Sequence, residues 1–340
     1  MLLAPMQRGM RSGSVVVMSA GLLSGALIVT AHSLMMAFAL IADLWRSNMP
    51  IREVRIETPE RVVEWRGGDI PTIFFQGTEK PIAEIELSPQ SEGVCSICAI
   101  GDFHNASKCH NRRLLEATRS YILKHRLYVI SPGVDPEMAL RGSKSEEWQY
   151  RQVDGHSMTP AMELSDTVDF LRPIADEGLL VAMTDDNHGE RWRRTAGGSF
   201  AEEVCKQLGV PEAYLGWQGH LNLKVGEQSY LVFVFHGSSA ATTQSGKMRA
   251  CLKLAEHNPR HHIFITGHLH DANGYQTTHI HPVDGYAAQR QQLFVMCGSY
   301  INYFGSYVEQ KNYRPGKMGE QTIRLHADCR FATTEIGGYL

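Results

Sequence analysis

Charged residues are missing from one long stretch near the start of the chain. Between Ser12 and Ala42 the sequence contains no Asp, Glu, Lys or Arg. The apolar part of this stretch, residues 15–42, exceeds the roughly 20 residues that a helix needs to cross a bilayer. Arg8 and Arg11 precede it, which favours a cytoplasmic N-terminus for a membrane anchor.

Two other interpretations of this N-terminal stretch stay open. A cleaved signal peptide is one, although the apolar run is long for that purpose and no clean small-x-small cleavage site follows it. An over-extended translation start is the other, because the pattern of a soluble protein begins abruptly at Met49. We therefore divide the chain into an apolar N-terminal segment, 1–48, and a folded domain, 49–340.

A disulfide framework is also lacking. The seven cysteines are an odd number spread over a long chain, which is not the pattern of a disulfide-bonded scaffold. Cys95 and Cys98 have the CxxC spacing, but no second CxxC completes a zinc site, and both lie in an apolar strand pattern. Ordinary strand cysteines in a reducing, cytoplasmic compartment are the prediction. This conflicts with the anchor orientation, which would place the folded domain outside the cytoplasm.

A strongly basic balance is absent too. The formal net charge is −3, which gives no indication of a general nucleic-acid-binding surface. An apolar fraction of 43% with 20% charged residues is typical of a globular protein. What the chain has in excess is histidine, with 16 residues concentrated in its second half.

Several of these histidines follow predicted strands. The run Ile263 to Thr266 is β-branched and aromatic, and it ends in Gly267, His268 and His270. Imidazoles at i and i+2 just past a strand end can enter one crevice, and the glycine permits a close turn. Two neutral imidazoles held together suit a divalent metal ion.

The same pattern recurs at three other strand ends. An apolar run ends in Asp102 and His104, another in Asn187 and His188, and a third in His236. In an open α/β sheet the carboxyl ends of the strands share one edge, where ligands bind. Four such endings predict a metal centre at that edge.

The remaining chain alternates strand and helix patterns, which predicts an α/β fold with β-rich ends. Predicted strands cover 54–57, 62–65, 72–76, 82–87, 93–100, 127–131, 293–296 and 322–325. Predicted helices cover 112–126, 160–173, 200–208 and 247–257, the second with Thr159 as its cap.

Read in order, these motifs resemble those of the calcineurin-like metallophosphoesterases. That family has D-x-H, G-D-x-x-[DE], G-N-H-[DE], H and G-H-x-H in succession. The resemblance covers about Gly93 to Leu325, and the run from Cys297 to Tyr303 is similar to a phage and prophage branch. It implies an α/β (α+β) fold, a β-sandwich flanked by helices, with two metal ions at its edge.

The resemblance also implies roles for the residues at the strand ends. By position, Asp102, His104 and His270 would bind the first metal ion, and Asn187, His236 and His268 the second. His188 would face the scissile phosphate as a general acid or as a hydrogen-bond donor. Mixed nitrogen and oxygen ligands suit Mn²⁺, Fe or Zn²⁺ better than Mg²⁺ alone.

Two motifs depart from the family pattern. Val134 stands where the second motif should supply the bridging aspartate, and Asp135 comes one residue late. Along an extended segment that slip turns the Asp135 side chain away from the site. If the loop rearranges to point it inward, Asp135 is a further candidate metal ligand. Asp186 replaces the usual glycine of the third motif, and would be strained if that turn needed a positive φ.

Three functions therefore stay open. The first is hydrolysis of a phosphodiester, with nucleic acid as one substrate, or of a phosphomonoester, by a water activated between two metal ions. The second is a degenerate, non-catalytic protein that binds metal or phosphate, because Val134 replaces the bridging aspartate. The third is a histidine-rich metal-storage domain, which leaves the order of the motifs unexplained.

The expected partners follow from these functions. A phosphate ester is the expected substrate, and Arg191 is a candidate for binding its phosphate, the alternative being a solvated face. Membrane association would take place through residues 15–42. No protein partner is implied.

Overall fold

The computed structural model describes residues 19–23, 26–30, 53–57, 61–66, 72–75, 80–137, 159–283 and 286–336, which form two compact units. The first unit spans Met1–Pro81 with Asp284–Tyr286. Its described residues form one sheet in the order β1 (Ser19–Leu23), β2 (Ala26–Thr30), β3 (Glu53–Glu57), β4 (Arg61–Arg66) and β5 (Thr72–Phe75). The predicted division at Met49 falls between β2 and β3, which pair in parallel.

Part of the apolar segment 15–42 is therefore described as the strands β1 and β2. The rest of that segment lies outside the described residues. Within the described ranges no helix is long and apolar enough to cross a membrane. The membrane anchor, the signal peptide and the over-extended start stay predictions.

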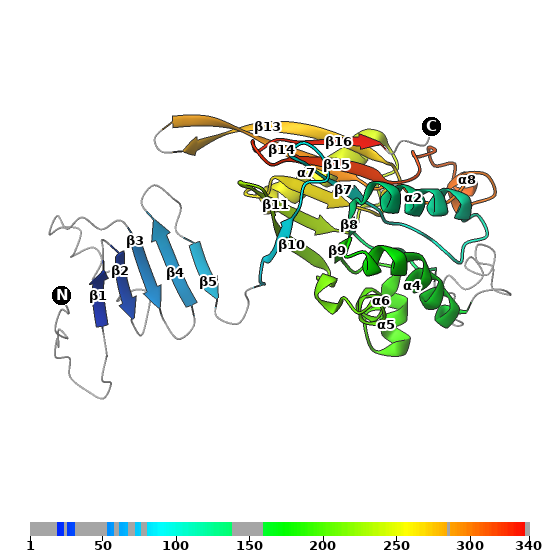
Figure 1. The fold of residues 1–340 in the computed structure, drawn as a ribbon, viewed down its shortest axis with the longest axis horizontal. Helices are drawn as coiled ribbons and strands as arrows, with labels where there is room; N and C mark the ends of the chain where they lie inside the picture. Colours follow the sequence, from blue (N-terminus) through cyan, green and yellow to red (C-terminus); the bar gives the residue numbers. More distant parts are fainter. Residues whose placement is uncertain are drawn as a thin grey trace. The chain divides into compact units, whose positions relative to one another are not determined.

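The second unit, Ile82–Val283 with Ala287–Leu340, contains two sheets (Figure 1). One has the order β13 (Asn273–Val283), β14 (Tyr286–Met296), β12 (Ile263–Thr266), β11 (Gln228–Phe235), β10 (Gln218–Val225) and β6 (Ala83–Leu87). The other has the order β16 (Ala332–Ile336), β15 (Gln321–His326), β7 (Val94–Ala99), β8 (Tyr128–Ser131) and β9 (Leu180–Met183). Ile97, Val232 and Ile265 belong to one apolar core between the sheets.

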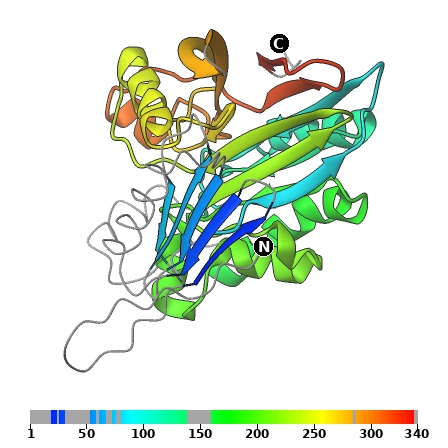
Figure 2. The same cartoon turned by 90° about the vertical axis from the view of Figure 1, so that its left-hand side faces the viewer.

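Helices cover the outer faces of this sandwich. A second core joins β7, β8 and β9 to α2 (Arg112–His125), α4 (Pro160–Asp176) and α6 (Phe200–Leu208). A third joins the other sheet to α7 (Gln244–His257). Figure 2 shows α7 (yellow) and the green helices on opposite sides of the strands. The predicted fold, a β-sandwich flanked by helices, is confirmed.

The direction of the strands brings their carboxyl ends to one edge. β7, β8 and β9 are parallel neighbours in one sheet, and β11, β12 and β14 are parallel neighbours in the other. β8, β9 and β12 have four mostly apolar residues each, and β7, β11 and β14 end in apolar runs. The edge where the loops after these strands meet is the place that the sequence predicted for a metal centre.

Most predicted elements are present, with differences at helix ends. The Thr159 hydroxyl accepts the predicted capping bond from the backbone N–H of Met162, but the helix runs past Pro173 to Asp176. Pro173 has no N–H to donate to the carbonyl of Asp169, so the helix continues to Asp176 with one hydrogen bond fewer in its last turns. Cys95 lies in the core between the sheets and Cys98 in the helix-side core, as expected of strand residues on opposite faces.

Elements with weaker patterns escaped sequence reasoning. They are α5 (Gly189–Ala196), the 3₁₀ turn Pro211–Ala213, β10, β13 with the first half of β14, α8 (Tyr307–Gln310) and β16. The end of β14 was predicted as the strand 293–296, whereas β1 and β2 were not predicted as strands. Charged and polar residues dominate α5 and the outer half of the hairpin of β13 and β14, so their periodicity is faint.

Candidate metal centre

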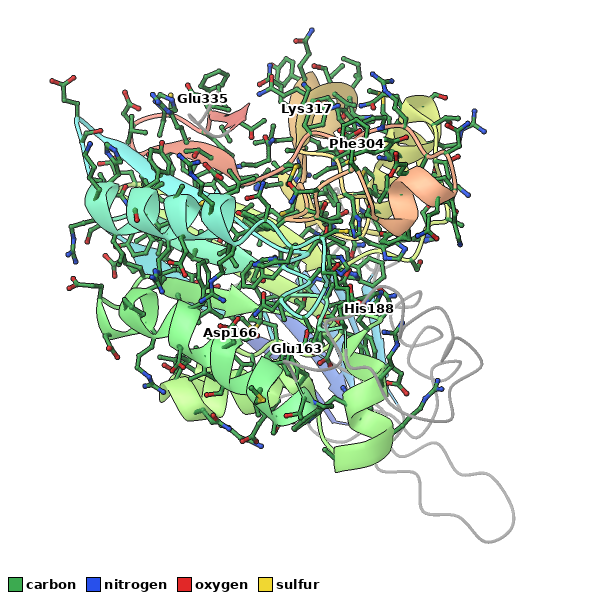
Figure 3. All side chains as sticks on the ribbon, turned by 90° about the vertical axis from the view of Figure 1, so that its right-hand side faces the viewer. Glu163, Asp166, His188, Phe304, Lys317 and Glu335 are labelled. Carbon is green, nitrogen blue, oxygen red and sulfur yellow. The ribbon has the colours of Figure 1, made fainter. Side chains whose placement is uncertain are left out.

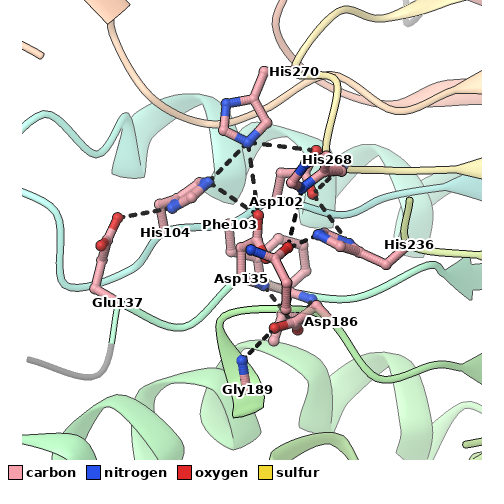
Figure 4. A network of polar contacts seen from close by, with 12 residues as sticks. Asp102, Phe103, His104, Asp135, Glu137, Asp186, Gly189, His236, His268 and His270 are labelled. Carbon is pink, nitrogen blue, oxygen red and sulfur yellow. Dashed lines mark hydrogen bonds and ion pairs between the residues drawn. The ribbon is translucent and has the colours of Figure 1, made fainter. Parts of the chain in front are cut away.

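The loops after five parallel strands carry the predicted site residues. Asp102 and His104 follow β7, Asp135 follows β8, Asn187 and His188 follow β9, His236 follows β11, and His268 and His270 follow β12. Figure 4 shows most of these side chains pointing toward one another. Two sheets thus contribute to one cluster, and residues 166 positions apart meet, since the backbone N–H of His268 donates to Asp102 Oδ1.

Asp135 lies at the centre of this cluster. Its Oδ1 is 3.1 Å from His236 Nε2, while its Oδ2 is 3.5 Å from His104 Nε2 and 3.7 Å from His270 Nε2. Each carboxylate oxygen therefore faces a different set of imidazoles. Among the described residues, three groups at this edge could hold a metal ion, and Asp135 belongs to all three.

This position corrects the expectation that a one-residue slip turns Asp135 away. The loop after β8 is not extended, because Asp135 has a left-handed φ of 50°. Asp186 holds that turn: its Oδ2 accepts hydrogen bonds from the backbone N–H groups of Val134 and Asp135, both at 3.1 Å. Its Oδ1 accepts a third from Gly189 at 2.6 Å. Asp186 itself is not left-handed, so the strain considered for it is not found.

Val134, at the family's usual aspartate position, packs in the apolar core instead. Its side chain is buried in the apolar cluster that contains Phe103 and Phe170. The backbone N–H of Phe103 donates to the carbonyl of Val134 at 2.7 Å, which joins the loops after β7 and β8. The left-handed turn thus places the valine in the core and the following aspartate in the cluster.

The imidazoles are oriented by partners on their Nδ1 atoms. His104 Nδ1 is 2.8 Å from Glu137 Oε1, His236 Nδ1 is 3.0 Å from the carbonyl of Pro132, and His270 Nδ1 is 3.0 Å from the Tyr307 hydroxyl. A neutral imidazole that donates from Nδ1 presents the lone pair of Nε2. Outer partners of this kind orient the ligands of metal sites, and here they turn three Nε2 atoms toward Asp135.

The distances within the cluster suit a shared ion. His104 Nε2 and His270 Nε2 are 3.1 Å apart. Two imidazole nitrogens bound to one tetrahedral Zn²⁺ lie about 3.3 Å apart, given a Zn–N bond of about 2.0–2.1 Å. His270 Nε2 is also 3.9 Å from Asp102 Oδ2.

Four buried atoms at this centre make no hydrogen bond of good geometry within the described part of the chain. They are Asp102 Oδ2, Asp135 Oδ1, His188 Nδ1 and His236 Nε2, although Asp135 Oδ1 and His236 Nε2 form an ion pair at 3.1 Å. Buried polar atoms are rarely left without a partner. Carboxylate oxygens and imidazole nitrogens are ligands for divalent transition metals, so this donor set fits such an ion.

The other side of the cluster is more open. His268 Nδ1 lies 3.0 Å from Asn187 Oδ1, where the asparagine is exposed. The ring of His268 stands edge-on to that of His236, with centroids 5.2 Å apart. His188 is half-buried, and its ring centroid lies 5.3 Å from that of His104.

The charges of the cluster favour bound cations. Burial opposes the charge of His236, but the carboxylate of Asp135 raises the pKa of this imidazole to about 10. Burial likewise opposes the charge of His104, yet Glu137 raises its pKa to about 9. Burial also opposes the charge of Asp135, and His236 and His188 hold its pKa well below the usual range. The buried carboxylates thus make a negative field that attracts positive charge.

Two glycines permit the close approach of these loops. A Cβ on Gly267 would come within 2.8 Å of Asp102 Oδ1, and one on Gly133 within 2.6 Å of the Asp186 Cβ. Left-handed φ values at Asp102, His104, Asp135, His268 and His270 add strain to the same loops. Backbone strain of this kind concentrates at functional sites and costs about 1–3 kcal/mol per residue.

Arg191 lies beside the cluster. Its guanidinium donates to the backbone carbonyl of Glu137 at 2.5 Å, and so supports the loop that orients His104. Its predicted contact with a substrate phosphate stays a prediction. Glu137, Asp186 and Tyr307 are the structural partners that sequence reasoning missed; the first two lie within or beside the motifs, but nothing local showed their contacts.

Comparisons with known proteins add structural likeness only. No family model and no curated protein matches the chain. Among solved structures the chain is similar to vacuolar protein sorting 29 of Cryptosporidium parvum, at 11% identity and a TM-score of 0.36, over 72% of this chain and 97% of that one. It is also similar to Vps29 of Entamoeba histolytica complexed with Zn²⁺, at 14% identity and a TM-score of 0.30, over 71% and 97%.

A further likeness is to a predicted phosphoesterase from Streptococcus pneumoniae TIGR4. It has 11% identity and a TM-score of 0.30, over 72% of this chain and 99% of that one. At such TM-scores these likenesses carry no argument about function. What the site can do follows from its own geometry.

Proposed function

We propose that this chain is a metal-dependent phosphoesterase of the calcineurin-like type that hydrolyses a phosphodiester. One observation carries the proposal: Asp135 offers Oδ1 to His236 and Oδ2 to His104 and His270. A carboxylate placed in this way can bridge two cations. The motif order around it supports the family, although Asp135 is one residue late in the second motif.

The two cations are assigned to two groups of residues. Asp102, His104 and His270 would hold the first, Asn187, His236 and His268 the second, and Asp135 would bridge them. Mn²⁺, Fe or Zn²⁺ fits these mixed nitrogen and oxygen ligands. When bound, two such ions supply a nucleophilic water and stabilise the charge of the phosphoryl group.

The chain itself supplies orientation and a proton donor. Glu137, Pro132 and Tyr307 fix the tautomers of three imidazoles, so that their lone pairs face the ions. His188 stands at the open side of the cluster, next to His104. From there its ring N–H can donate to a phosphate oxygen or to the departing oxygen of the ester.

The alternative is a non-catalytic protein that binds metal or phosphate. Its motivation was the loss of a bridging carboxylate at Val134. Asp135 now offers a carboxylate at the centre, so we propose catalysis ahead of this alternative. An expected phosphate ester partner, a cytoplasmic location and membrane association through residues 15–42 are carried forward as proposals.

Metal content and turnover test this function together. We expect two metal ions per chain and hydrolysis of bis-(p-nitrophenyl) phosphate with added Mn²⁺. Asp135→Asn should remove metal from both groups and lower kcat by at least 100-fold, because both lose a ligand. Asp169→Asn, which makes the same change at an exposed position of α4, is the matched control. One metal ion or none, without turnover and without an effect of Asp135→Asn, would favour the non-catalytic alternative.

A further inference from the structure

A small pocket opens directly beside the cluster. It has a volume of about 210 Å³ and is lined by both His268 and His270, and by Tyr303, Tyr307 and Tyr313. Drug-sized ligands occupy pockets of roughly 300–1,000 Å³, so this one suits a single ring system. The tyrosines provide flat apolar surfaces next to the place where the phosphate would lie.

The charge of this pocket is suited to an anion. Arg314 lines it and is exposed, whereas Lys247 is buried and paired with Asp271 at 3.5 Å. Among the described residues that line the pocket, none is Asp or Glu. Phe304 and Lys317, labelled in Figure 3, belong to the same C-terminal segment that bounds it.

A second, larger groove continues from the first. It has a volume of about 530 Å³, and both cavities are lined by Ser239 and Leu269. Along its wall α7 presents Arg249 and Lys253, which are exposed and four residues apart, so they lie on one face of the helix. Its lining, within the described residues, also contains no acidic side chain.

Aromatic rings and a row of cations are the two features of single-strand binding sites. Bases stack on aromatic side chains, while a positively charged groove follows the phosphates. We propose that the substrate is single-stranded nucleic acid, with the nucleotide beside the scissile phosphate in the tyrosine pocket and the neighbouring phosphates along α7. The inference rests on the proposed function, because it takes the scissile phosphate to lie at Asp135.

Binding of a single strand, measured under conditions without turnover, tests the inference independently of catalysis. Fluorescence anisotropy of labelled octathymidylate is measured on the full chain in EDTA, over a range of salt concentrations. Arg249→Ala combined with Lys253→Ala should lower the slope of log K against log[salt] by about 1.4, since each phosphate contact on a single strand contributes about 0.7. Lys124→Ala, an exposed lysine at the end of α2, should leave the slope unchanged.

Separate variants test the tyrosines that line the small pocket. Tyr303→Ala should weaken binding roughly ten-fold or more through the loss of base stacking, and Tyr303→Phe, which keeps the ring, should restore it. A duplex of the same length should bind more weakly, because its bases cannot enter the pocket. Equal affinity for the duplex, or an unchanged salt slope in the α7 double variant, would overturn the inference.

Turnover separates this inference from the proposed function. With Mn²⁺ we expect the p-nitrophenyl ester of thymidine 5′-phosphate to be hydrolysed with a kcat/KM at least ten-fold above that of methyl p-nitrophenyl phosphate. Similar values for the two, both lowered by Asp135→Asn, would reject the nucleic-acid substrate and keep the phosphoesterase. Tight, tyrosine-dependent strand binding without hydrolysis of either ester would support the strand site and reject the phosphoesterase.

Discussion

Strand β12 has a pair of histidines at each end, and the two pairs differ in their surroundings. His268 and His270 follow the strand and meet carboxylates that come from the other sheet. His261 and His262 precede it and meet another histidine and backbone groups instead: His261 Nε2 is 3.1 Å from His220 Nδ1, and His262 Nδ1 accepts a hydrogen bond from the backbone N–H of Leu231 at 2.9 Å.

The different surroundings affect the pKa values of the pair that precedes the strand, His261 and His262. Burial lowers the pKa of both His261 and His262 to about 4, with further lowering from His220 or Arg290. Of the described residues, the groups that could hold a metal include His268 and His270 but neither His261 nor His262. What distinguishes the two pairs of this chain is the buried carboxylates that the other sheet brings to His268 and His270.

Removing one imidazole from each end is the strongest test of this difference. His270→Ala should lower the affinity for the first metal ion more than 100-fold, beyond the roughly 10–100-fold typical of outer partners. His262→Asn at the other end should leave metal content unchanged. Metal analysis after dialysis against graded chelator measures both, and equal losses would show that the two pairs are equivalent.

The next effect in size is expected from disrupting the turn that places the Asp135 carboxylate in the cluster. Asp186→Ala leaves three buried backbone N–H groups without an acceptor, which should lower the free energy of unfolding by about 3 kcal/mol. The variant should also lose metal, because Asp135 is no longer held toward the imidazoles. Urea unfolding and metal content report the two effects, and a stable variant that binds two ions would contradict this role.

A milder change affects one outer partner. Glu137→Gln keeps the shape of the side chain but removes the charge that faces His104 Nδ1. We expect the affinity for the first ion to fall about 10–100-fold. Tyr307→Phe removes the corresponding partner of His270, so similar losses in both variants would confirm a common role. Calorimetric titration with Mn²⁺ is the measurement.

The smallest expected effect is on the pH dependence of stability, which His261 and His262, the pair that precedes β12, should influence. In the unfolded chain each imidazole has a pKa near 6.5, whereas the folded pKa is about 4. The unfolded state therefore binds more protons as pH falls from about 6.5 to about 4, and stability is lost over that window. Allowing for partial exposure, we expect His262→Asn to reduce this loss by about 1–2 kcal/mol.

Urea unfolding of both proteins at neutral pH and at pH 4.5 gives that difference. Carboxylates of the metal centre also titrate in acid, but they are common to the two proteins and cancel. A loss of stability that is the same with and without His262 would contradict the assignment.

Local patterns predicted the strand ends and most of the residues that the structure brings together at this edge. A strand of four apolar residues followed by a polar loop is visible in the sequence, and parallel strands share an edge whatever their exact neighbours. The helix capped by Thr159 was equally readable. Such features depend on residues close together in the chain.

The position of Asp135 could not be read in the same way. It depends on a left-handed turn held by Asp186, a contact 51 residues away. Tyr307 is similarly remote, 37 residues from the histidine it orients. Contacts of this range follow from the packing of two sheets, which no local pattern specifies.

β7, which leads into the first site residues, gains its two neighbours in the sheet at different stages of synthesis. It lies between β8 and β15. β8 (Tyr128–Ser131) follows it closely in the chain, whereas β15 (Gln321–His326) comes after every residue of the candidate metal centre. On the ribosome, one edge of β7 therefore stays unpaired after all the candidate ligands have been made, and the sheet that leads into Asp102 and His104 closes only when β15 emerges.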